Sequence, residues 1–292
     1  ELVFWLINLK VDKTSVFLVM EHTGFYSFQL EKFLHQHQIQ FAKVSALAIK
    51  RSLGVIRGKN DKIDAERIAR FGFEKRDKLV AAKPAHPVLQ RLQMLHSTRA
   101  RLTKYRQSLA CALKEYRMVL SSTDPIIKIQ LTLVKEIAQK IKVLDDQIKQ
   151  CIAKADQCVN QNFKLLTSIK GVGDVIATAT LVKTKNFIAF KNARKFCCFC
   201  GSAPFDHTSG KSIRKKTRVS HLADKTMKTL LTMGARTAIQ HDKELKAFYE
   251  RRLAMGKSKN STINIVRNKL IYRMFAVINR QTPFIEQYSK AV

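Results

Sequence analysis

Acidic residues are scarce in this sequence, and this scarcity indicates which class of partner the protein binds. The chain has 22 aspartates and glutamates against 54 lysines and arginines, which gives a formal net charge of +32. This excess argues against a small-metabolite enzyme with an acidic surface. It favours a polyanionic partner, with nucleic acid ahead of an anionic membrane surface. Because 46% of the residues are hydrophobic, the chain is not a disordered basic tail.

Long apolar runs and a cysteine framework are also lacking. No run approaches the roughly 18 apolar residues that cross a bilayer, so we expect no membrane span and no membrane partner. Residues 1–5 show neither a basic region nor a cleavage pattern, which predicts no signal peptide. Six cysteines in 292 residues are too few for a disulfide scaffold. They indicate a reducing cytoplasmic location, and a nucleic-acid partner would place the chain at the nucleoid.

Three of the cysteines stand together in an apolar segment. Cys197 and Cys200 have the spacing of a metal-binding pair, and His207 follows nearby. A structural zinc site usually needs a second pair, and no other cysteines have suitable spacing. Because free cysteine is a common core residue, packing in the hydrophobic core is the favoured interpretation, with metal binding as the alternative.

Charge and periodicity divide the chain into three segments, which we take as its domains. Residues 1–80 carry 14 basic and 9 acidic residues, a net charge of +5, and residues 81–162 carry 14 and 6, a net charge of +8. Residues 163–292 carry 26 basic and 7 acidic residues, a net charge of +19. Contacts with a polyanion are therefore expected mainly in the third segment, which has a mostly helical pattern.

The first segment has an α/β pattern. Residues 16–20 form an unbroken apolar run that ends at Glu21, as in a strand buried on both faces. Residues 25–37 have helical spacing, residues 39–44 form a second candidate strand, and residues 61–73 form a further helix. This alternation of strands and helices predicts an α/β domain.

The second segment is expected to form a long antiparallel helical hairpin. Apolar residues recur at three- and four-residue steps on both sides of a break at residues 121–125. Asp124 suits an N-cap, and Pro125 suits the first position of the second helix. The single apolar seam closes either within the hairpin or on a second subunit. We interpret this coiled coil as a spacer and an oligomerisation element.

Three carboxylates of the first segment form a candidate metal site. Glu21 follows the predicted strand, at the end where α/β sheets place their sites. Asp61 and Asp64 stand three residues apart at a helix start and project from one face. If the three converge, they would hold one or two Mg²⁺ ions, since hard oxygen ligands suit that metal. Taken alone, an Asp-x-x-Asp pair is more often explained by capping and by the helix dipole.

A Gly-x-Gly word in the third segment has the pattern of a helix-hairpin-helix. Residues 165–170 end an apolar helix, Gly171 and Gly173 follow, and a helix of small residues begins after them. Glycines at such a turn let backbone N–H groups approach a phosphate, and the next helix adds its positive end. A Rossmann fingerprint is excluded, because no third glycine arrives and no strand precedes the turn. Binding of the DNA backbone is favoured over a simple tight turn.

The stretch 205–218 combines a serine with a dense basic run. Ser209 would act as the nucleophile toward a phosphodiester, with neighbouring cations stabilising the charge of the phosphorane. From composition alone, a solvated basic loop is the more common explanation. Such a density of charge is nevertheless costly without a polyanion. The basic residues of the run are Lys211, Arg214, Lys215, Lys216 and Arg218.

In this order, these words resemble those of the DEDD insertion-sequence transposases, the insertion sequence 110 family, which includes the Piv-type DNA invertases. The resemblance covers nearly the whole chain, and the combination is specific although each word alone is not. The matching words are residues 20–26 (MEHTGFY), 59–69 (KNDKIDAERIA), 169–173 (IKGVG), 190–196 (FKNARKF), 201–211 (GSAPFDHTSGK) and 248–251 (FYER).

The resemblance implies a RuvC-like, RNase H-fold domain in the first segment, an assembly coiled coil in the second and a C-terminal serine transposase domain in the third. Glu21, Asp61 and Asp64 would match the second, third and fourth acids of the DEDD set. Ser209 would match the serine that attacks DNA. The family also implies Mg²⁺ as cofactor, element ends and target DNA as substrates, dimers or tetramers, and a structured guide RNA that pairs with both DNAs.

One part of the family pattern has no counterpart. The family's first acid stands on the opening strand in a Gly-Ile-Asp-like word, well before the glutamate, and no such word precedes Glu21. Asn8 and Asp12 lack the flanking pattern. We therefore expect the first strands and the first Asp of the RuvC-like domain to be absent from this chain, which as given would not exchange strands.

Two other functions are compatible with the same residues. A structure-selective, RuvC-like nuclease would use the carboxylates alone and would keep its cleavage activity without Ser209. A non-catalytic remnant would only bind nucleic acid, through the Gly171–Gly173 turn and the 211–218 run. Its binding would depend strongly on salt, and it would show no turnover with any metal.

Overall fold

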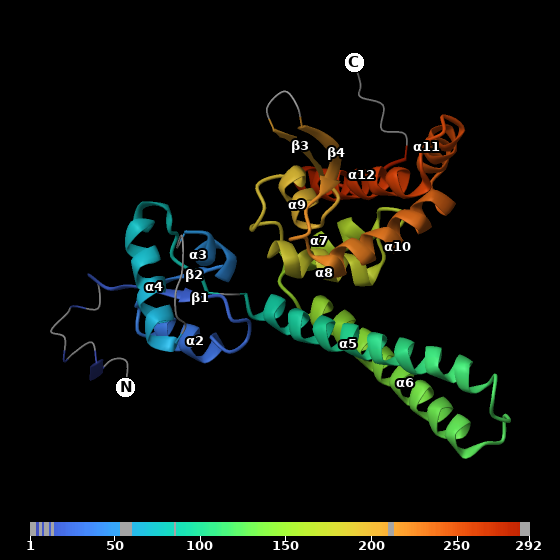
Figure 1. Ribbon diagram of the computed structural model, residues 1–292, viewed down its shortest axis with the longest axis horizontal. Helices are drawn as coiled ribbons and strands as arrows, with labels where there is room; N and C mark the ends of the chain where they lie inside the picture. Colours follow the sequence, from blue (N-terminus) through green and yellow to red (C-terminus); the bar gives the residue numbers. More distant parts are fainter. Residues whose placement is uncertain are drawn as a thin grey trace. The chain divides into compact units, whose positions relative to one another are not determined.

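The chain folds into two compact units, residues 1–85 and residues 86–292. Figure 1 shows both as ribbons, and each is described by itself. The structure is a computed structural model that describes residues 4, 5, 8, 12, 15–52, 60–84, 86–209 and 213–286, with the backbone alone for 207–209 and 213–216.

The first unit is a small α/β domain, as predicted. Its two strands are parallel, with Phe17 opposite Gln40 and Glu21 opposite Val44. The helix between the strands and the helix that begins at Asp61 lie close to their predicted ranges, whereas the short helices at 46–52 and 76–78 were not predicted. The elements are β1 (Phe17–Glu21), α2 (Phe28–Gln36), β2 (Gln40–Val44), α3 (Ala46–Ser52), α4 (Asp61–Glu74) and the 3-10 helix η2 (Arg76–Lys78).

Side chains of β1 alternate between two small apolar clusters. Leu18 packs with Phe41 beside α2, whereas Val19 packs with Val44 beside α3 and α4. Gly72 allows α4 to approach β1, because a Cβ there would lie 2.6 Å from a methyl carbon of Val19. Both clusters are small, and β1 is half-buried. Both faces of β1 are therefore covered, as predicted, but only in part.

The second unit is mostly helical, as predicted, and begins with the long antiparallel hairpin of α5 and α6 (Figure 1). No helix in the described part of the chain has the length and hydropathy to cross a membrane. The elements are α5 (Pro87–Tyr116), α6 (Pro125–Ala153), α7 (Gln157–Thr167), α8 (Asp174–Thr184), α9 (Ala193–Phe199), β3 (Pro204–Ser209), β4 (Ile213–Val219), α10 (Lys225–His241), α11 (Lys243–Ala254) and α12 (Lys259–Arg280).

The apolar seam of the hairpin closes within the chain. Buried Leu92 and Leu95 of α5 pack with Ile148 and Ile152 of α6. Both predictions for the start of α6 are confirmed: Pro125 is its first residue, and the preceding aspartate caps it by accepting a hydrogen bond from a backbone N–H at 2.8 Å. The hairpin is thus held together by its own side chains.

The main core of the second unit lies among helices α7 to α12. Cys197 and Cys200 belong to it, with 2% and 0% of their surface exposed. Burial raises the pKa of the Cys197 thiol to about 11 and also raises that of Cys200. Both thiols are therefore protonated at neutral pH and pack as apolar core groups. The interpretation of these cysteines as core residues is confirmed.

The basic run, expected as a loop, is instead a strand of a β-hairpin. β3 pairs with β4 in antiparallel register, with a bulge between Phe205 and His207. β4 alternates basic residues at 214, 216 and 218 with Ile213, Thr217 and Val219, the period of an exposed two-stranded ribbon. The lysine at 215 interrupts this alternation, and the density of charge obscures the strand pattern in the sequence.

Candidate catalytic and nucleic-acid-binding sites

The three candidate carboxylates lie in the first unit. Glu21 is the half-buried last residue of β1, and Asp61 and Asp64 lie in the first turn of α4. No three His, Cys, Asp or Glu side chains of the described residues form a group that could hold a metal ion. The structure therefore places the acids at the ends of their elements without drawing them into one metal-holding group.

Capping does not explain the acids at the start of α4. Asn60 is the N-cap, and its side-chain oxygen accepts a hydrogen bond from the N–H of Ile63 at 2.8 Å. Asp64 instead forms an ion pair with Arg67 at 3.1 Å, and Asp61 is exposed. The helix dipole still favours both carboxylates at this end. The alternative explanation by capping fails, because another residue already fills that position.

The two glycines between α7 and α8 have different surroundings. Gly171 has a φ of +91° and lies against α10: a Cβ there would come within 2.5 Å of the carbonyl oxygen of Gly234 and 2.7 Å of the Cβ of Ala238. Gly173 is the N-cap of α8 with an ordinary φ of −86°, and a Cβ there would meet nothing within 4 Å. The first glycine serves packing, and the second leaves the start of α8 uncovered.

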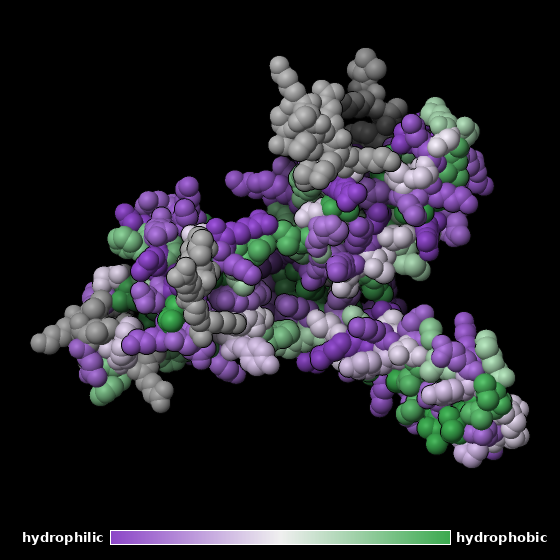
Figure 2. Space-filling model, viewed as in Figure 1, coloured by the Kyte–Doolittle hydropathy of each residue, from purple (hydrophilic) through white to green (hydrophobic). Residues whose placement is uncertain are grey.

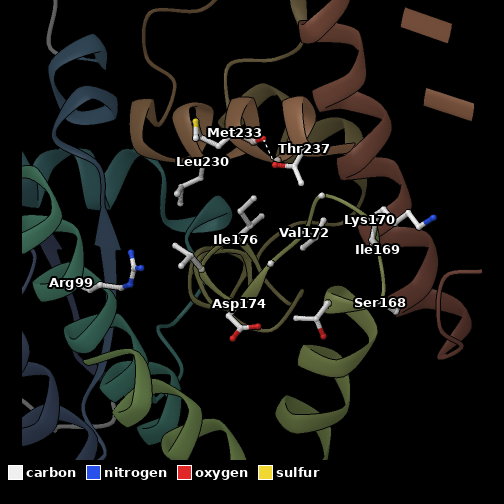
Figure 3. Close-up of a pocket in the computed structure, with 15 residues that line it drawn as sticks. Arg99, Ser168, Ile169, Lys170, Val172, Asp174, Ile176, Leu230, Met233 and Thr237 are labelled. Carbon is white, nitrogen blue, oxygen red and sulfur yellow. Dashed lines mark hydrogen bonds between the residues drawn. The ribbon is translucent and has the colours of Figure 1, made fainter. Parts of the chain in front are cut away.

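A cavity of about 620 Å³ runs along this turn, and Figure 3 shows the side chains that line it. Arg99 of α5 lies on one side of it, and Leu230 and Met233 of α10 on another. Each charged group of the cavity already has an ionic partner, so attraction for a phosphate would come from backbone N–H groups and the end of α8. The pairs are Lys170 with Glu286, Asp174 with Lys149 at 3.6 Å, and Arg99 with Asp145.

The candidate nucleophile is placed at one end of the β-hairpin. Ser209 is the last residue of β3 and pairs with Ile213 of β4, while Thr208 pairs with Arg214. The strand that carries the serine therefore runs directly beside the strand that carries most of the basic residues. Of these, Arg218 is exposed at the other end of the hairpin. Lys211 and the side chains of Ser209, Arg214, Lys215 and Lys216 lie outside the described part of the chain.

Sequence reasoning missed a second cavity, of about 580 Å³, at the base of this hairpin. One wall belongs to α12, where Asn264 and Asn268 each donate a hydrogen bond to the carbonyl oxygen of Ser202, at 2.8 and 3.1 Å. The i, i+4 spacing of these asparagines on one helix face was the available signal. Arg99 was missed as well, because its place beside the glycine turn depends on the tertiary packing of α5.

Comparison with known proteins gives matches along most of the chain. The family model described as Transposase IS116/IS110/IS902 family matches residues 163–250, and a DEDD transposase model of IS110 elements matches residues 1–123. The pilin gene-inverting protein of Moraxella bovis is 28% identical over 292 residues, which cover 97% of this chain and 86% of that protein. The transposase for insertion sequence element IS1111A of Coxiella burnetii is 23% identical over 77% of this chain and 68% of its own.

Proposed function

Because this chain belongs to the IS116/IS110/IS902 family of transposases, whose DEDD model covers its N-terminal part, we propose that it exchanges DNA strands through Ser209. The observation that carries this proposal is the pairing of β3, which ends in Ser209, with the basic strand β4, inside the region that the family model matches. The test is the formation of a covalent bond between Ser209 and DNA.

In the proposed reaction, the hydroxyl oxygen of Ser209 attacks a backbone phosphorus. A bond forms between this oxygen and phosphorus, one phosphorus–oxygen bond of the DNA breaks, and the leaving oxygen takes up a proton. Attack by the hydroxyl of a second strand then reverses these changes and joins the strands. Cationic groups of β4 beside the serine would stabilise the additional negative charge of the phosphorane.

We place the contacts with the DNA backbone at two surfaces of the second unit. At the first, the uncovered end of α8 beside Gly173 presents N–H groups to a phosphate in the manner of a helix-hairpin-helix. At the second, the basic run supplies Lys211, Arg214, Lys215, Lys216 and Arg218. Element ends and target DNA are the proposed ligands. The net charge of +19 in residues 163–292 also supports binding of a structured guide RNA.

Mg²⁺ is the cofactor that we propose for the first unit, with Glu21, Asp61 and Asp64 as its ligands. Carboxylate oxygens are hard donors that suit this ion, and the match to a DEDD model implies a carboxylate site. When bound, Mg²⁺ would supply stabilisation of negative charge on a phosphate. Support comes from this donor chemistry and from the family match, since the described residues form no group of three that could hold a metal ion.

An Asp64→Asn variant is expected to bind Mn²⁺, a spectroscopic substitute for Mg²⁺, at least about tenfold more weakly than the wild type. The reason is the loss of one anionic ligand. Glu66→Gln is the matched control, because Glu66 lies on the same helix and pairs with Arg70 at 3.4 Å. Electron paramagnetic resonance counts the bound ions. Equal binding by Asp64→Asn and the wild type would exclude Asp64 as a ligand.

The helical hairpin is the proposed site of self-association. Where α5 passes into α6, apolar side chains gather on its surface (Figure 2). Met118, Val119 and Ile129 are 83%, 85% and 60% exposed. Since the seam closes within the chain, this end of the hairpin, and not the seam, is the surface that a second copy would cover.

The double variant Val119→Lys/Ile129→Lys is therefore expected to shift the protein toward monomer by at least about tenfold in dissociation constant, because association would bury unpaired lysines. Sedimentation velocity over a concentration series measures the change. Ile188→Lys/Met255→Lys adds the same charge at residues 82% and 61% exposed outside the hairpin, and it should associate like the wild type. A wild type that stays monomeric, or a double variant that associates normally, would contradict the assignment.

A further inference from the structure

The cavity at the base of the β-hairpin is separate from the glycine turn. Pro204 of β3 and Val219 of β4, which are paired in register, form its apolar lining together with Ile265 of α12. Exposed Arg218 and His221 add cationic and hydrogen-bonding groups. At about 580 Å³ the cavity falls within the range of sites for small organic ligands, roughly 300–1,000 Å³.

The charge of this cavity differs from that of the glycine-turn cavity. None of the nine residues that line it is acidic. The glycine-turn cavity, in contrast, includes Asp174, and its lysine and arginine are held in ion pairs. An apolar surface bordered by a guanidinium and an imidazole, without a competing carboxylate, suits a ligand that joins a flat apolar ring to an anion. A nucleotide has this composition.

Partly buried hydrogen bonds hold the wall of the cavity in place. The carbonyl oxygen of Ser202, a residue with no exposed surface, accepts from both Asn264 and Asn268. Arg267 donates to the side-chain oxygen of Asn264 at 2.7 Å and is itself 8% exposed. These contacts join the start of β3 to α12 before any ligand arrives. The site is therefore preformed, which lowers the entropic cost of binding.

We propose that this cavity receives one unpaired nucleotide of the DNA strand that is attacked by Ser209. This assignment rests on the proposed function and adds a subsite to it. Arg218 pairs with Phe205, four residues before Ser209, so the cavity lies about 13 Å along the ribbon from the serine. The bound nucleotide is therefore a near neighbour of the attacked phosphate and fixes where along the strand the attack falls.

The test compares binding of the full chain to a fully paired duplex and to the same duplex with one bulged nucleotide, by fluorescence anisotropy. Ile265→Trp fills the cavity without changing its charge, and Ile188→Trp is the control at a site 82% exposed and outside the cavity. We expect the wild type and the control to prefer the bulged duplex about tenfold, the size of one base contact. Ile265→Trp should lose this preference and keep its affinity and salt dependence for paired DNA.

A second arm changes only the DNA. The wild type should bind a duplex with an abasic bulge about tenfold more weakly than one with a normal bulge. This comparison tests the proposal even if circular dichroism shows that Ile265→Trp is unfolded. Equal binding of both bulges, or a folded Ile265→Trp that keeps the preference, overturns the proposal. If adenosine monophosphate binds the wild type and DNA does not, the cavity is a free-nucleotide site and the strand assignment is wrong. If the wild type does not bind the paired duplex at all, the proposed function is overturned.

Discussion

Replacing Ser209 with alanine is expected to abolish the covalent attachment of this protein to DNA. The substrate is a duplex of element-end sequence in which one backbone oxygen is replaced by a bridging sulfur, tested in both possible bridging positions. Sulfur leaves without needing a proton, so the attack depends on the nucleophile more than on groups that assist departure. Removal of the nucleophile should lower the yield of protein–DNA adduct at least about a thousandfold, as measured by denaturing gel and mass spectrometry.

Ser212→Ala is the matched control, since it removes the same group three residues away in the sequence and should leave the adduct in place. An adduct that persists in Ser209→Ala would assign the attack to another residue. Cleavage without any adduct in both proteins would support the RuvC-like nuclease, which uses carboxylates alone. Binding of DNA with neither cleavage nor adduct would support the non-catalytic alternative.

Gly171→Ala is expected to destabilise the second unit by about 3 kcal/mol. A left-handed backbone costs an alanine roughly 1–2 kcal/mol, and overpacking against α10 costs roughly 1–3 kcal/mol. The new Cβ would have to displace the backbone of Gly234, which no side-chain rotation can relieve. Thermal unfolding should show Tm lower by roughly 6–12 °C. An unchanged Tm would mean that the close contact between this turn and α10 is absent in solution.

Gly173→Ala is the contrasting substitution, two residues away at the start of α8. Its φ is ordinary and its Cβ would enter open space, so the loss of stability should stay below about 1 kcal/mol. The methyl group would stand between the helix end and a phosphate. Duplex binding should therefore weaken about tenfold, the value of one hydrogen bond to a charged group. Wild-type affinity in this variant would show that the turn only packs against α10.

Local patterns in the sequence predict local features of the fold well. The N-cap at Asp124 with the start of α6 at Pro125, and the start of α4 at Asp61, follow from short-range rules. The two strands of the first unit and its helices α2 and α4 follow from periodicity in the same way. The β-hairpin was missed because lysine and arginine at 214–216 conceal a period of two. In that stretch, the density of charge indicated a solvated loop, and it outweighed the β-branched residues that favour a strand.

The candidate sites show where such reasoning ends. Both glycines of the turn were identified as one phosphate-binding word. Only the contact with Gly234 shows that Gly171 serves packing whereas Gly173 is uncovered. That contact joins residues more than sixty positions apart, which no local pattern encodes. The cavity beside α12 was missed for the same reason, since its walls come from a hairpin and a helix that are distant in the sequence.

The bulge between Phe205 and His207 divides the β-hairpin into two parts, the base and the end that carries Ser209. Below it, Pro204 and Val219 are joined to α12 through the neighbouring Ser202. Beyond it lies the pair of Ser209 and Ile213. A bulge adds twist and redirects the strand that follows. The pairing shifts by one residue at this position, so that Ser209 stands opposite Ile213; in the register of the base, Arg214 would stand there instead.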